Sequence, residues 1–311
     1  MDIHQVLVIG AGTMGSQIAL LCARAGLAVT CHDVDAARIE AARGELTARS
    51  ARDVAKGVRT QDNEDAAFAR LTFGTDLPAL AAGADFVIEA ALENLDVKRA
   101  LFAQLDQLTP PHAILATNSS GFVPSALADA TARPERVCNV HFFNPALVMK
   151  CVEVVAGPDT APETVTTAAE LVDRLGKTAV ILDKEIPGFI ANRILNAVRD
   201  EAIFLYENGV GSVEAIDTAC RTALGYPMGP FELMDLTGID IGYYTKRARF
   251  AETGDPRDAP STSVSELVER GHLGRKTGRG WYVYDSNGLK IGPATDVEAQ
   301  DNSTPTGPPQ H

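Results

Sequence analysis

A histidine and a glutamate flank a tight turn in the stretch VHFFNPALVMKCVE, which runs from Val140 to Glu153. His141 ends a short apolar run, the pair Asn144-Pro145 breaks it, and Glu153 lies in a second run. Read as strand, turn and strand, the stretch predicts His141 and Glu153 on neighbouring strands. A carboxylate that orients an imidazole makes a general base, because histidine titrates near neutral pH and its tautomer follows its hydrogen-bond partner. The alternative is a core histidine satisfied among aromatic residues.

A glycine-rich loop upstream predicts a dinucleotide site. The β-rich run Ile3–Ile9 ends in the loop Gly10–Gly15, GAGTMG, which opens a helix, and Asp33 closes the next strand. Such glycines permit a tight turn, close backbone approach to a pyrophosphate and packing of helix on strand, with the phosphates at the positive helix end. Asp33 would accept hydrogen bonds from the adenine ribose and repel a 2′-phosphate, which favours NAD over NADP. The alternative is a glycine turn in an unrelated α/β unit.

Strands alternate with helices up to about residue 182. This alternation predicts an α/β fold of the Rossmann type, with a mainly parallel, doubly wound sheet. Ligands of such sheets bind outside the carboxyl ends of the strands. Asp33, Glu93, Ser120 and His141 all fall at predicted strand ends, so we expect one cleft to hold them together.

The alternation stops at Ile186-Pro187-Gly188, where a helical pattern begins. We therefore expect a dinucleotide-binding domain over residues 1–186 and an all-α C-terminal domain over 187–285. Asn192, one turn into the first helix of that domain, is expected to face the cleft. Residues 286–311 are rich in Asn, Gly, Thr, Pro and Gln and are expected to form a disordered tail.

A predicted helix after Asp35 carries the one locally basic stretch of the chain, with Arg38, Arg43, Arg49, Arg52 and Lys56 along it. A solvated helix face is one interpretation. The other is a docking surface for a phosphorylated substrate handle, since cations beside a cleft bind phosphates.

The composition argues against several other classes of protein. The 311 residues carry a formal net charge of −13, which argues against a nucleic-acid or membrane-surface partner, because both need a basic face. Five widely spaced cysteines form neither a disulfide framework nor a zinc spacing, so we expect buried thiols in a reducing compartment and no metal. The chain offers no secretory leader and no apolar run of about 18 residues. We therefore expect a cytoplasmic protein.

Taken in order, several motifs resemble the L-3-hydroxyacyl-CoA dehydrogenase family. They are the Gly10–Gly15 loop, Glu93-Asn94, Asn118-Ser119-Ser120, His141-Phe-Phe-Asn-Pro, Val152-Glu153, Pro187-Gly-Phe-Ile-Ala-Asn192-Arg193, Gly225-Tyr-Pro-Met-Gly-Pro-Phe-Glu and Lys276-Thr-Gly. The resemblance implies NAD-dependent, reversible oxidation of an (S)-3-hydroxyacyl-CoA to the 3-ketoacyl-CoA. It also implies a homodimer formed through the helical C-terminal domain.

The resemblance further implies a role for each matching residue. His141 would remove the 3-hydroxyl proton as hydride leaves C3, and Glu153 would orient His141 and stabilise its imidazolium form. Ser120 and Asn192 would hold the reacting oxygen and the thioester side of the substrate. The implied cofactor contacts are Gly10, Gly12, Thr13, Met14, Gly15, Asp33, Glu93, Lys98, Asn118, Ser120 and Lys276. The implied substrate contacts are Ser50, Lys56, Ser120, Asn144 and Asn192.

Two other functions stay open at this point. One is a dehydrogenase of the same fold that acts on a free hydroxy acid or sugar acid, as in the gulonate- and carnitine-type relatives. The other is a non-catalytic NAD-binding dimer. Ser119, Gly121 and the pair Ala146-Leu147 depart from the residues usual in the family, which leaves the acyl preference undecided.

Overall fold

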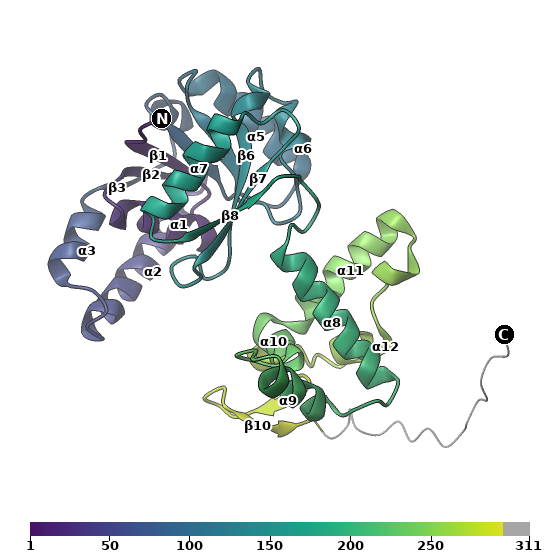
Figure 1. Ribbon diagram of the computed structural model, residues 1–311. Coiled ribbons are helices and arrows are strands. Elements are labelled where there is room, and N and C mark those ends of the chain that lie inside the picture. The colour runs from purple at the N-terminus through teal and green to yellow at the C-terminus, as the bar shows by residue number, and fades with distance from the viewer. Residues whose placement is uncertain (295–311) are drawn as a thin grey trace. The chain divides into compact units, whose positions relative to one another are not determined.

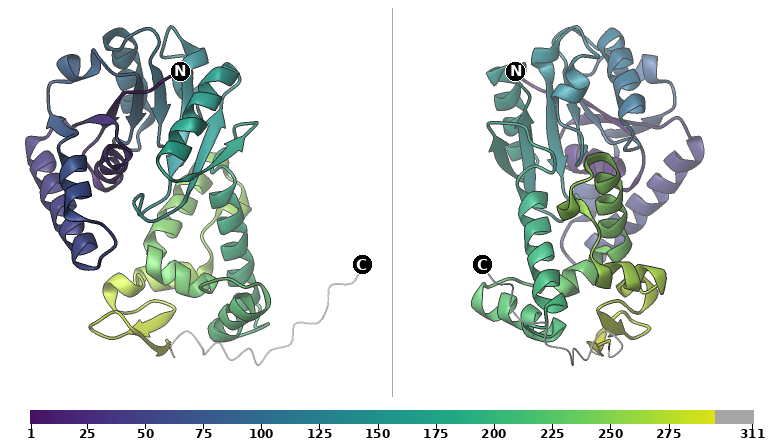
Figure 2. Two further views of the ribbon diagram at one scale, coloured as in Figure 1. Left: turned by 60° about the vertical axis from the view of Figure 1, so that its left-hand side comes forward. Right: turned by 90° about the vertical axis from the view of Figure 1, so that its right-hand side faces the viewer.

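The computed structural model describes residues 1–294. The chain divides into two compact units, Met1–Ile190 and a second unit that begins at Ala191 (Figures 1 and 2). Within residues 1–294, none of the helices combines the length and apolar character needed to span a membrane. The same residues contain no group of three or more His, Cys, Asp or Glu side chains placed to hold a metal ion.

The first unit is an α/β unit with one eight-stranded sheet. Its elements are β1 (Gln5–Ile9), α1 (Thr13–Arg24), β2 (Ala28–His32), α2 (Ala36–Ala55), α3 (Gln61–Phe68), β3 (Leu71–Gly74), α4 (Leu77–Ala81), β4 (Phe86–Glu89), α5 (Leu95–Leu108), β5 (Ile114–Thr117), α6 (Ser125–Ala128), η1 (Pro134–Arg136), β6 (Val137–Phe142), β7 (Cys151–Ala156), α7 (Pro162–Arg174) and β8 (Thr178–Leu182).

The strand order is β3-β2-β1-β4-β5-β6-β7-β8. Every neighbouring pair is parallel except β6 and β7, which are antiparallel. The carboxyl ends of β1, β2, β4, β5 and β6 therefore lie along one edge of the sheet. The predicted Rossmann-type, mainly parallel fold is confirmed.

Helices cover both faces of this sheet, and alternate strand residues point to opposite faces. In β1, Val6 and Val8 belong to a core formed with α1, α2, α3 and α7. Leu7 and Ile9 belong to a second core, formed with α4, α5 and α6. The sheet is thus doubly wound, and its central strands are buried on both sides.

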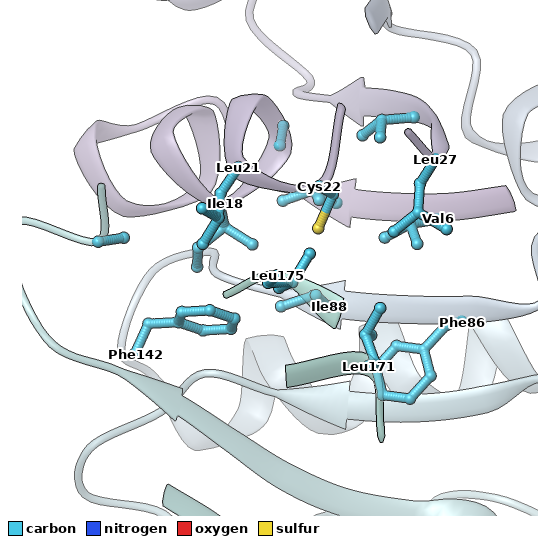
Figure 3. Close-up of a cluster of buried hydrophobic side chains, with 14 of the residues drawn as sticks. Val6, Ile18, Leu21, Cys22, Leu27, Phe86, Ile88, Phe142, Leu171 and Leu175 are labelled. Carbon is cyan, nitrogen blue, oxygen red and sulfur yellow. The ribbon is translucent and has the colours of Figure 1, made fainter. Parts of the chain in front are cut away.

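Figure 3 shows the first of these cores, where Ile18, Leu21 and Cys22 of α1 lie over the sheet. Ile18 and Cys22 are fully buried, as is Phe86 of β4. Removing one such large side chain from water contributes about 1.5–3 kcal/mol. This packing fixes the start of α1 relative to the strand ends, where the glycine loop lies.

The second unit is mainly helical. Its elements are α8 (Ala191–Glu207), α9 (Val213–Ala223), α10 (Pro230–Thr237), α11 (Ile239–Thr253), η2 (Pro256–Asp258), α12 (Thr262–Glu269), η3 (Arg275–Thr277), β9 (Tyr282–Tyr284) and β10 (Lys290–Pro293). Phe231 and Trp281 lie at the centre of its core, with ring centroids 4.7 Å apart.

Two buried aspartates form hydrogen bonds to the backbone after two glycine-containing motifs of this unit, the motif before α10 and the motif before β9. Asp217 accepts hydrogen bonds from the N–H groups of Phe231 and Glu232, at the start of α10. Asp235 accepts from the N–H groups of Trp281 and Tyr282, at the start of β9. Burial raises the pKa of Asp235 to about 6 and also raises the pKa of Asp217. In this structure, both motifs connect elements of the helical core.

The structure corrects two expectations for this part of the chain. The unit is not entirely helical, because β9 and β10 form a two-stranded antiparallel sheet. A tail that begins at residue 286 is wrong for residues 286–294, since β10 lies there and Ala294 is buried. Asp285 accepts hydrogen bonds from the N–H groups of Asn287 and Leu289 and so closes the turn. The rest of the expected tail, 295–311, lies outside the described residues.

Candidate active site

The glycine loop has the geometry that a pyrophosphate needs. Gly10 has a φ of +100°, and a Cβ there would meet the carbonyl oxygen of Ala90 at 2.6 Å. A Cβ on Gly15 would overlap the carbonyl oxygen of Gly10, so α1 packs directly on the loop. Gly12 faces open space, and the first turn of α1 carries no acidic side chain. The loop therefore fits a diphosphate at the positive end of α1.

Asp33 follows β2 and lies beside this loop. One carboxylate oxygen accepts a hydrogen bond from the N–H of Ala11 at 2.8 Å, and the other accepts from the N–H of Asp35 at 3.0 Å. A carboxylate oxygen has two acceptor positions, so each oxygen keeps capacity for a ribose hydroxyl. The structure thus joins Asp33 to the glycine loop.

His141 and Glu153 are direct partners across the antiparallel pair β6–β7. His141 Nδ1 lies 2.9 Å from Glu153 Oε2, and the two side chains are 6% and 1% exposed. The second carboxylate oxygen, Oε1, accepts a hydrogen bond from the N–H of Ile190 at 3.0 Å. The carboxylate is thus held on both oxygens, and it can orient the imidazole and stabilise a positive charge on it.

Aromatic rings and an asparagine further position the histidine. The rings of Phe143 and Phe189 lie 4.5 and 5.4 Å from the imidazole, measured between centroids. Asn118 Oδ1 accepts a hydrogen bond from the N–H of Phe142, so it ties the loop after β5 to the end of β6. Beyond Phe143, exposed Asn144 precedes Pro145 through a cis peptide bond.

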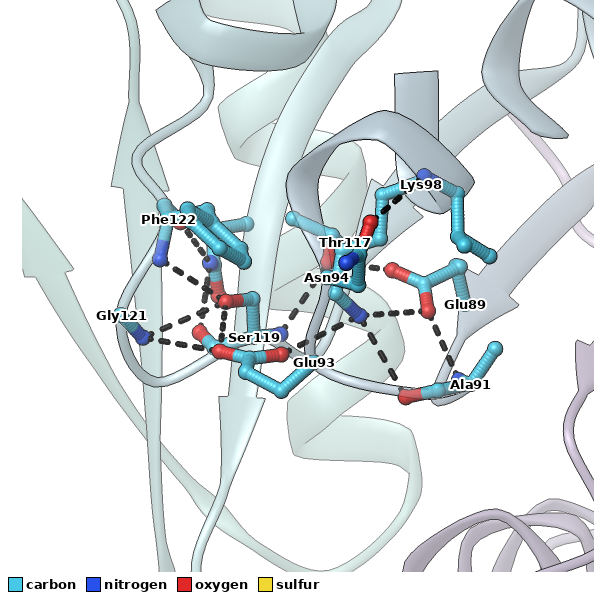
Figure 4. A network of polar contacts seen from close by, with 11 residues as sticks. Glu89, Ala91, Glu93, Asn94, Lys98, Thr117, Ser119, Gly121 and Phe122 are labelled. Atoms are coloured by element: carbon cyan, nitrogen blue, oxygen red, sulfur yellow. Dashed lines mark hydrogen bonds and ion pairs between the residues drawn. The ribbon is translucent and has the colours of Figure 1, made fainter. Parts of the chain in front are cut away.

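Ser120 follows β5 in the chain, and its neighbours Ser119 and Gly121 belong to a polar network that Figure 4 shows. Ser120 itself is exposed. Its neighbour Ser119 is buried and donates a hydrogen bond from Oγ to Glu93. Glu93 in turn pairs with Lys98, which is buried. The predicted cofactor residues Glu93 and Lys98 therefore belong to the network that supports the Ser120 turn.

The remaining predicted residues lie in several parts of the two units. Thr13 is exposed and Met14 partly buried in the first turn of α1. Ser50 lies on the buried stripe of α2, whereas Lys56 is exposed at its end. In the second unit, partly buried Asn192 lies in the first turn of α8, and Lys276 pairs with Asp240 at 2.6 Å. These two residues belong to a different unit from His141.

The basic helix α2 borders a cavity of about 300 Å³. Its lining includes Gln17 of α1, Arg49 and Arg52 of α2, and Leu147 of the loop after β6. The N–H of Leu147 donates to Gln17 Oε1 at 3.3 Å, so that loop is joined to α1. Arg49 also pairs with Asp53 at 3.0 Å.

Sequence reasoning missed Glu89, a fully buried carboxylate at the end of β4. It pairs with Lys98 at 2.6 Å and accepts a hydrogen bond from Thr117 Oγ1 at 2.7 Å. A sequence signal that could have found Glu89 is a charged residue at the end of the apolar strand FVIE. It stands nine positions before a lysine on the next helix. A buried charge requires a partner, and that pattern supplies one.

A doubly wound sheet with this glycine loop and Asp33 beside it defines the class of Rossmann-type dinucleotide-binding proteins. Comparison with known proteins gives the family. The model of the 3-hydroxyacyl-CoA dehydrogenase NAD-binding domain matches residues 5–186, and the model of the C-terminal domain of the same family matches residues 188–284.

Individual relatives agree with this match. The chain is 40% identical over 285 residues to the probable 3-hydroxybutyryl-CoA dehydrogenase of Bacillus subtilis, covering 92% of this chain and 99% of the relative. It is 37% identical to the human mitochondrial hydroxyacyl-coenzyme A dehydrogenase, over 91% of each chain. The crystal structure of (S)-3-hydroxybutyryl-CoA dehydrogenase PaaH1 from Ralstonia eutropha superposes with a TM-score of 0.84 at 36% identity, covering 92% of this chain and all of that one.

The chain belongs to the 3-hydroxyacyl-CoA dehydrogenase family, and it is an NAD-dependent oxidoreductase. The expected family and cofactor are confirmed.

Proposed function

We propose that this protein oxidises an (S)-3-hydroxyacyl-CoA to the 3-ketoacyl-CoA, reversibly and with His141 as the base. The observation that carries the proposal is the buried His141–Glu153 pair at the carboxyl edge of the sheet, the edge that also carries the glycine loop. An alcohol oxidation needs a proton acceptor near the cofactor, and this pair supplies one.

In the proposed reaction the substrate loses a proton from the 3-hydroxyl and a hydride from C3. His141 Nε2 takes the proton, while Nδ1–H donates to Glu153 Oε2, 2.9 Å away. Glu153 stabilises the imidazolium that forms, and its second oxygen stays bonded to the N–H of Ile190. Bound NAD supplies the acceptor for the hydride. In the reverse direction His141 returns the proton to the alkoxide.

The other predicted site residues complete the proposal. Ser120 would donate a hydrogen bond to the reacting oxygen, which suits an exposed hydroxyl on a held turn. Asn192 would hold the thioester side, and Asn144 would contact the substrate. Toward the cofactor we assign Gly10, Gly12, Thr13, Met14, Gly15, Asp33, Glu93, Lys98, Asn118, Ser120 and Lys276.

We assign the CoA handle to the cavity beside α2. Arg49 and Arg52 line it, and guanidinium groups bind phosphates with paired hydrogen bonds. Ser50 and Lys56, on the same helix and at its end, are the substrate contacts implied by the family.

The direct test compares (S)-3-hydroxybutyryl-CoA with free 3-hydroxybutyrate as substrates for NAD reduction. The proposal expects turnover of the thioester and little turnover of the free acid. Comparable rates on both would favour a dehydrogenase of a free hydroxy acid. NADH binding with no turnover of acyl-CoA esters of any length would favour a non-catalytic NAD-binding protein.

We further propose that the protein is a homodimer formed through its helical C-terminal unit. The support is a set of large apolar side chains that helices of this unit leave exposed, namely Ile194, Phe204, Leu236, Ile241 and Tyr244. Homodimer interfaces are rich in such apolar surface. Sedimentation velocity on the full chain measures the state, and a monomer at micromolar concentration would contradict the proposal.

The proposed compartment is the cytoplasm. All five cysteines are free, and burial raises the pKa of Cys22, Cys31 and Cys138 to about 12, so these three remain neutral thiols. A thiol titration of freshly isolated, denatured protein should count five free thiols. A lower count would show disulfides and contradict a reducing compartment.

A further inference from the structure

Hydrogen bonds hold the backbone of both neighbours of Ser120, which are Ser119 and Gly121. Ser119 is held by its N–H, which donates to Thr117 Oγ1 at 3.1 Å, and by its carbonyl oxygen, which accepts from Asn139 Nδ2 at 2.9 Å. The N–H of Gly121 donates to Glu93 Oε1 at 3.2 Å. The turn is therefore fixed on both sides of Ser120, and the exposed hydroxyl is presented by a rigid frame.

One hydrogen-bonded arm connects this turn to Glu89. Thr117 Oγ1 donates to Glu89 Oε2 at 2.7 Å and accepts from the N–H of Ser119. Because the hydroxyl hydrogen is used on Glu89, the lone pairs of Thr117 are left for Ser119. Glu89 thus sets the direction in which Thr117 can bond.

A second arm reaches the same turn through charges. Lys98 lies between two carboxylates, with Nζ 2.6 Å from Glu89 Oε1 and 3.2 Å from Glu93 Oε2. The other oxygen of Glu93 accepts from Ser119 Oγ and from the N–H of Gly121. Both arms begin at Glu89 and converge on the turn that carries Ser120 (Figure 4).

We propose that Glu89 is a positioning residue for the dehydrogenase reaction, which acts by fixing the Ser120 hydroxyl through Thr117 and through Lys98 and Glu93. The inference rests on the proposed role of Ser120 toward the reacting oxygen. Glu89 is fully buried and its own bonds go to Lys98, to Thr117 and to the N–H of Ala91, so it works through other residues.

The proposed positioning role depends on the negative charge of Glu89. With a neutral side chain at position 89, Glu93 is the one charged partner that the buried ammonium of Lys98 keeps within residues 1–294. Glu93 is then drawn toward Lys98, because a buried charge without full compensation is costly. Its bonds to Ser119 and Gly121 weaken, and the Ser120 hydroxyl loses its fixed position. A misplacement of about 1 Å can lower the rate of an enzymatic reaction about 100-fold, so we expect the loss to appear in kcat.

The test is a double-mutant cycle between Glu89→Gln and Ser120→Ala, with kcat for (S)-3-hydroxybutyryl-CoA as the readout. We expect Glu89→Gln to lower kcat about 10-fold or more in the wild-type background, on the scale of the about 10- to 100-fold losses caused by removing residues that orient the ligands of metal sites. In the Ser120→Ala background no hydroxyl remains to be positioned. With NAD saturating, so that weaker cofactor contacts at Glu93 and Lys98 appear in KM for NAD, the same change should lower kcat less than about 2-fold.

A matched control separates positioning from general loss of structure. Glu64 is 1% exposed and pairs with Arg24 at 2.6 Å, so it is a similarly buried, ion-paired glutamate outside the network. Glu64→Gln should lower Tm and leave kcat of the folded protein unchanged, in both backgrounds.

Each outcome decides between the proposals. Suppose that Ser120→Ala lowers kcat and that Glu89→Gln lowers kcat by the same factor in both backgrounds. The positioning role of Glu89 is then overturned, while the assignment of Ser120 stands. If Ser120→Ala keeps wild-type kcat, the assignment of Ser120 fails and the inference fails with it. Should Glu89→Gln not fold, Thr117→Val removes only the first arm and keeps the side-chain shape. It should lower kcat about 3-fold alone and not at all in Ser120→Ala, and an equal loss in both backgrounds would contradict the inference.

Discussion

Replacing Glu153 by glutamine removes one charge from the proposed base and leaves the shape of the side chain nearly unchanged. In the structure the carboxylate bonds to His141 Nδ1 at 2.9 Å and to the N–H of Ile190 at 3.0 Å. The glutamine oxygen can keep one of these bonds. If the amide N–H₂ faces His141, it donates to Nδ1 and places the ring proton on Nε2, where the base must accept a proton.

The expected loss follows from the charge on His141 after proton transfer. Imidazolium and carboxylate with charge centres about 4 Å apart attract by about 4 kcal/mol at an effective dielectric constant near 20. A neutral amide retains a hydrogen bond worth about 1 kcal/mol. The difference of about 3 kcal/mol corresponds to about a 150-fold lower kcat, since about 1.4 kcal/mol is tenfold.

The assay is steady-state NAD reduction with (S)-3-hydroxybutyryl-CoA, together with NADH binding by fluorescence. We expect Glu153→Gln to bind NADH within about twofold of wild type, because the Glu153 side chain is only 1% exposed and its carboxylate is turned to His141 and to the N–H of Ile190. Glu153→Asp keeps the charge and should recover part of the rate. A Glu153→Gln variant that keeps kcat within about threefold of wild type would show that the charge of Glu153 does not stabilise the imidazolium of His141.

Three further predictions test other parts of the molecule. Asp33→Ala removes the carboxylate that would repel a 2′-phosphate, so the preference for NAD over NADP should fall at least about 10-fold in kcat/KM; unchanged discrimination would count against Asp33. Arg52→Ala removes a cation from the cavity beside α2, so KM for the acyl-CoA should rise about 5- to 10-fold at nearly constant kcat; an unchanged KM would place the CoA handle elsewhere. Burial holds the pKa of Asp235 at about 6, above its unfolded value near 3.9, so the native state binds the extra proton and Asp235 contributes less stability as pH rises from about 4 to 6. Urea unfolding should therefore show wild type losing stability relative to Asp235→Asn across that window, and a gap that is constant with pH would contradict the shifted pKa.

The His141–Glu153 pair was predictable because it depends on local rules. Two apolar runs separated by a short break favour an antiparallel pair, and the two residues then meet as register partners, as they do in β6 and β7. The alternation of strands and helices likewise predicted the edge at which the glycine loop and Asp33 lie. Periodicity and turn residues carry this information without any knowledge of packing.

The Glu89 network was not predictable in the same way. Its bonds join the end of β4, the first turn of α5 and the end of β5, and they depend on side-chain rotamers in a packed layer. The sequence predicts a short strand that ends at Tyr284, where β9 lies, but its hairpin partner β10 was missed for a different reason. The polar composition after Tyr284 suggested a tail, although the pair Asn287-Gly288 between two β-forming runs is itself a hairpin signal. The prediction of a tail relied on the polar composition and overlooked this turn signal.

The most direct measurement of the central claim is the turnover of (S)-3-hydroxybutyryl-CoA with NAD by His141→Gln beside the wild-type enzyme, with NADH affinity measured on both. We expect the variant to bind NADH nearly as wild type does and to lose at least about 1,000-fold in kcat, because the proton acceptor is gone while the glycine loop and Asp33 are intact. Wild-type turnover by His141→Gln would contradict the claim.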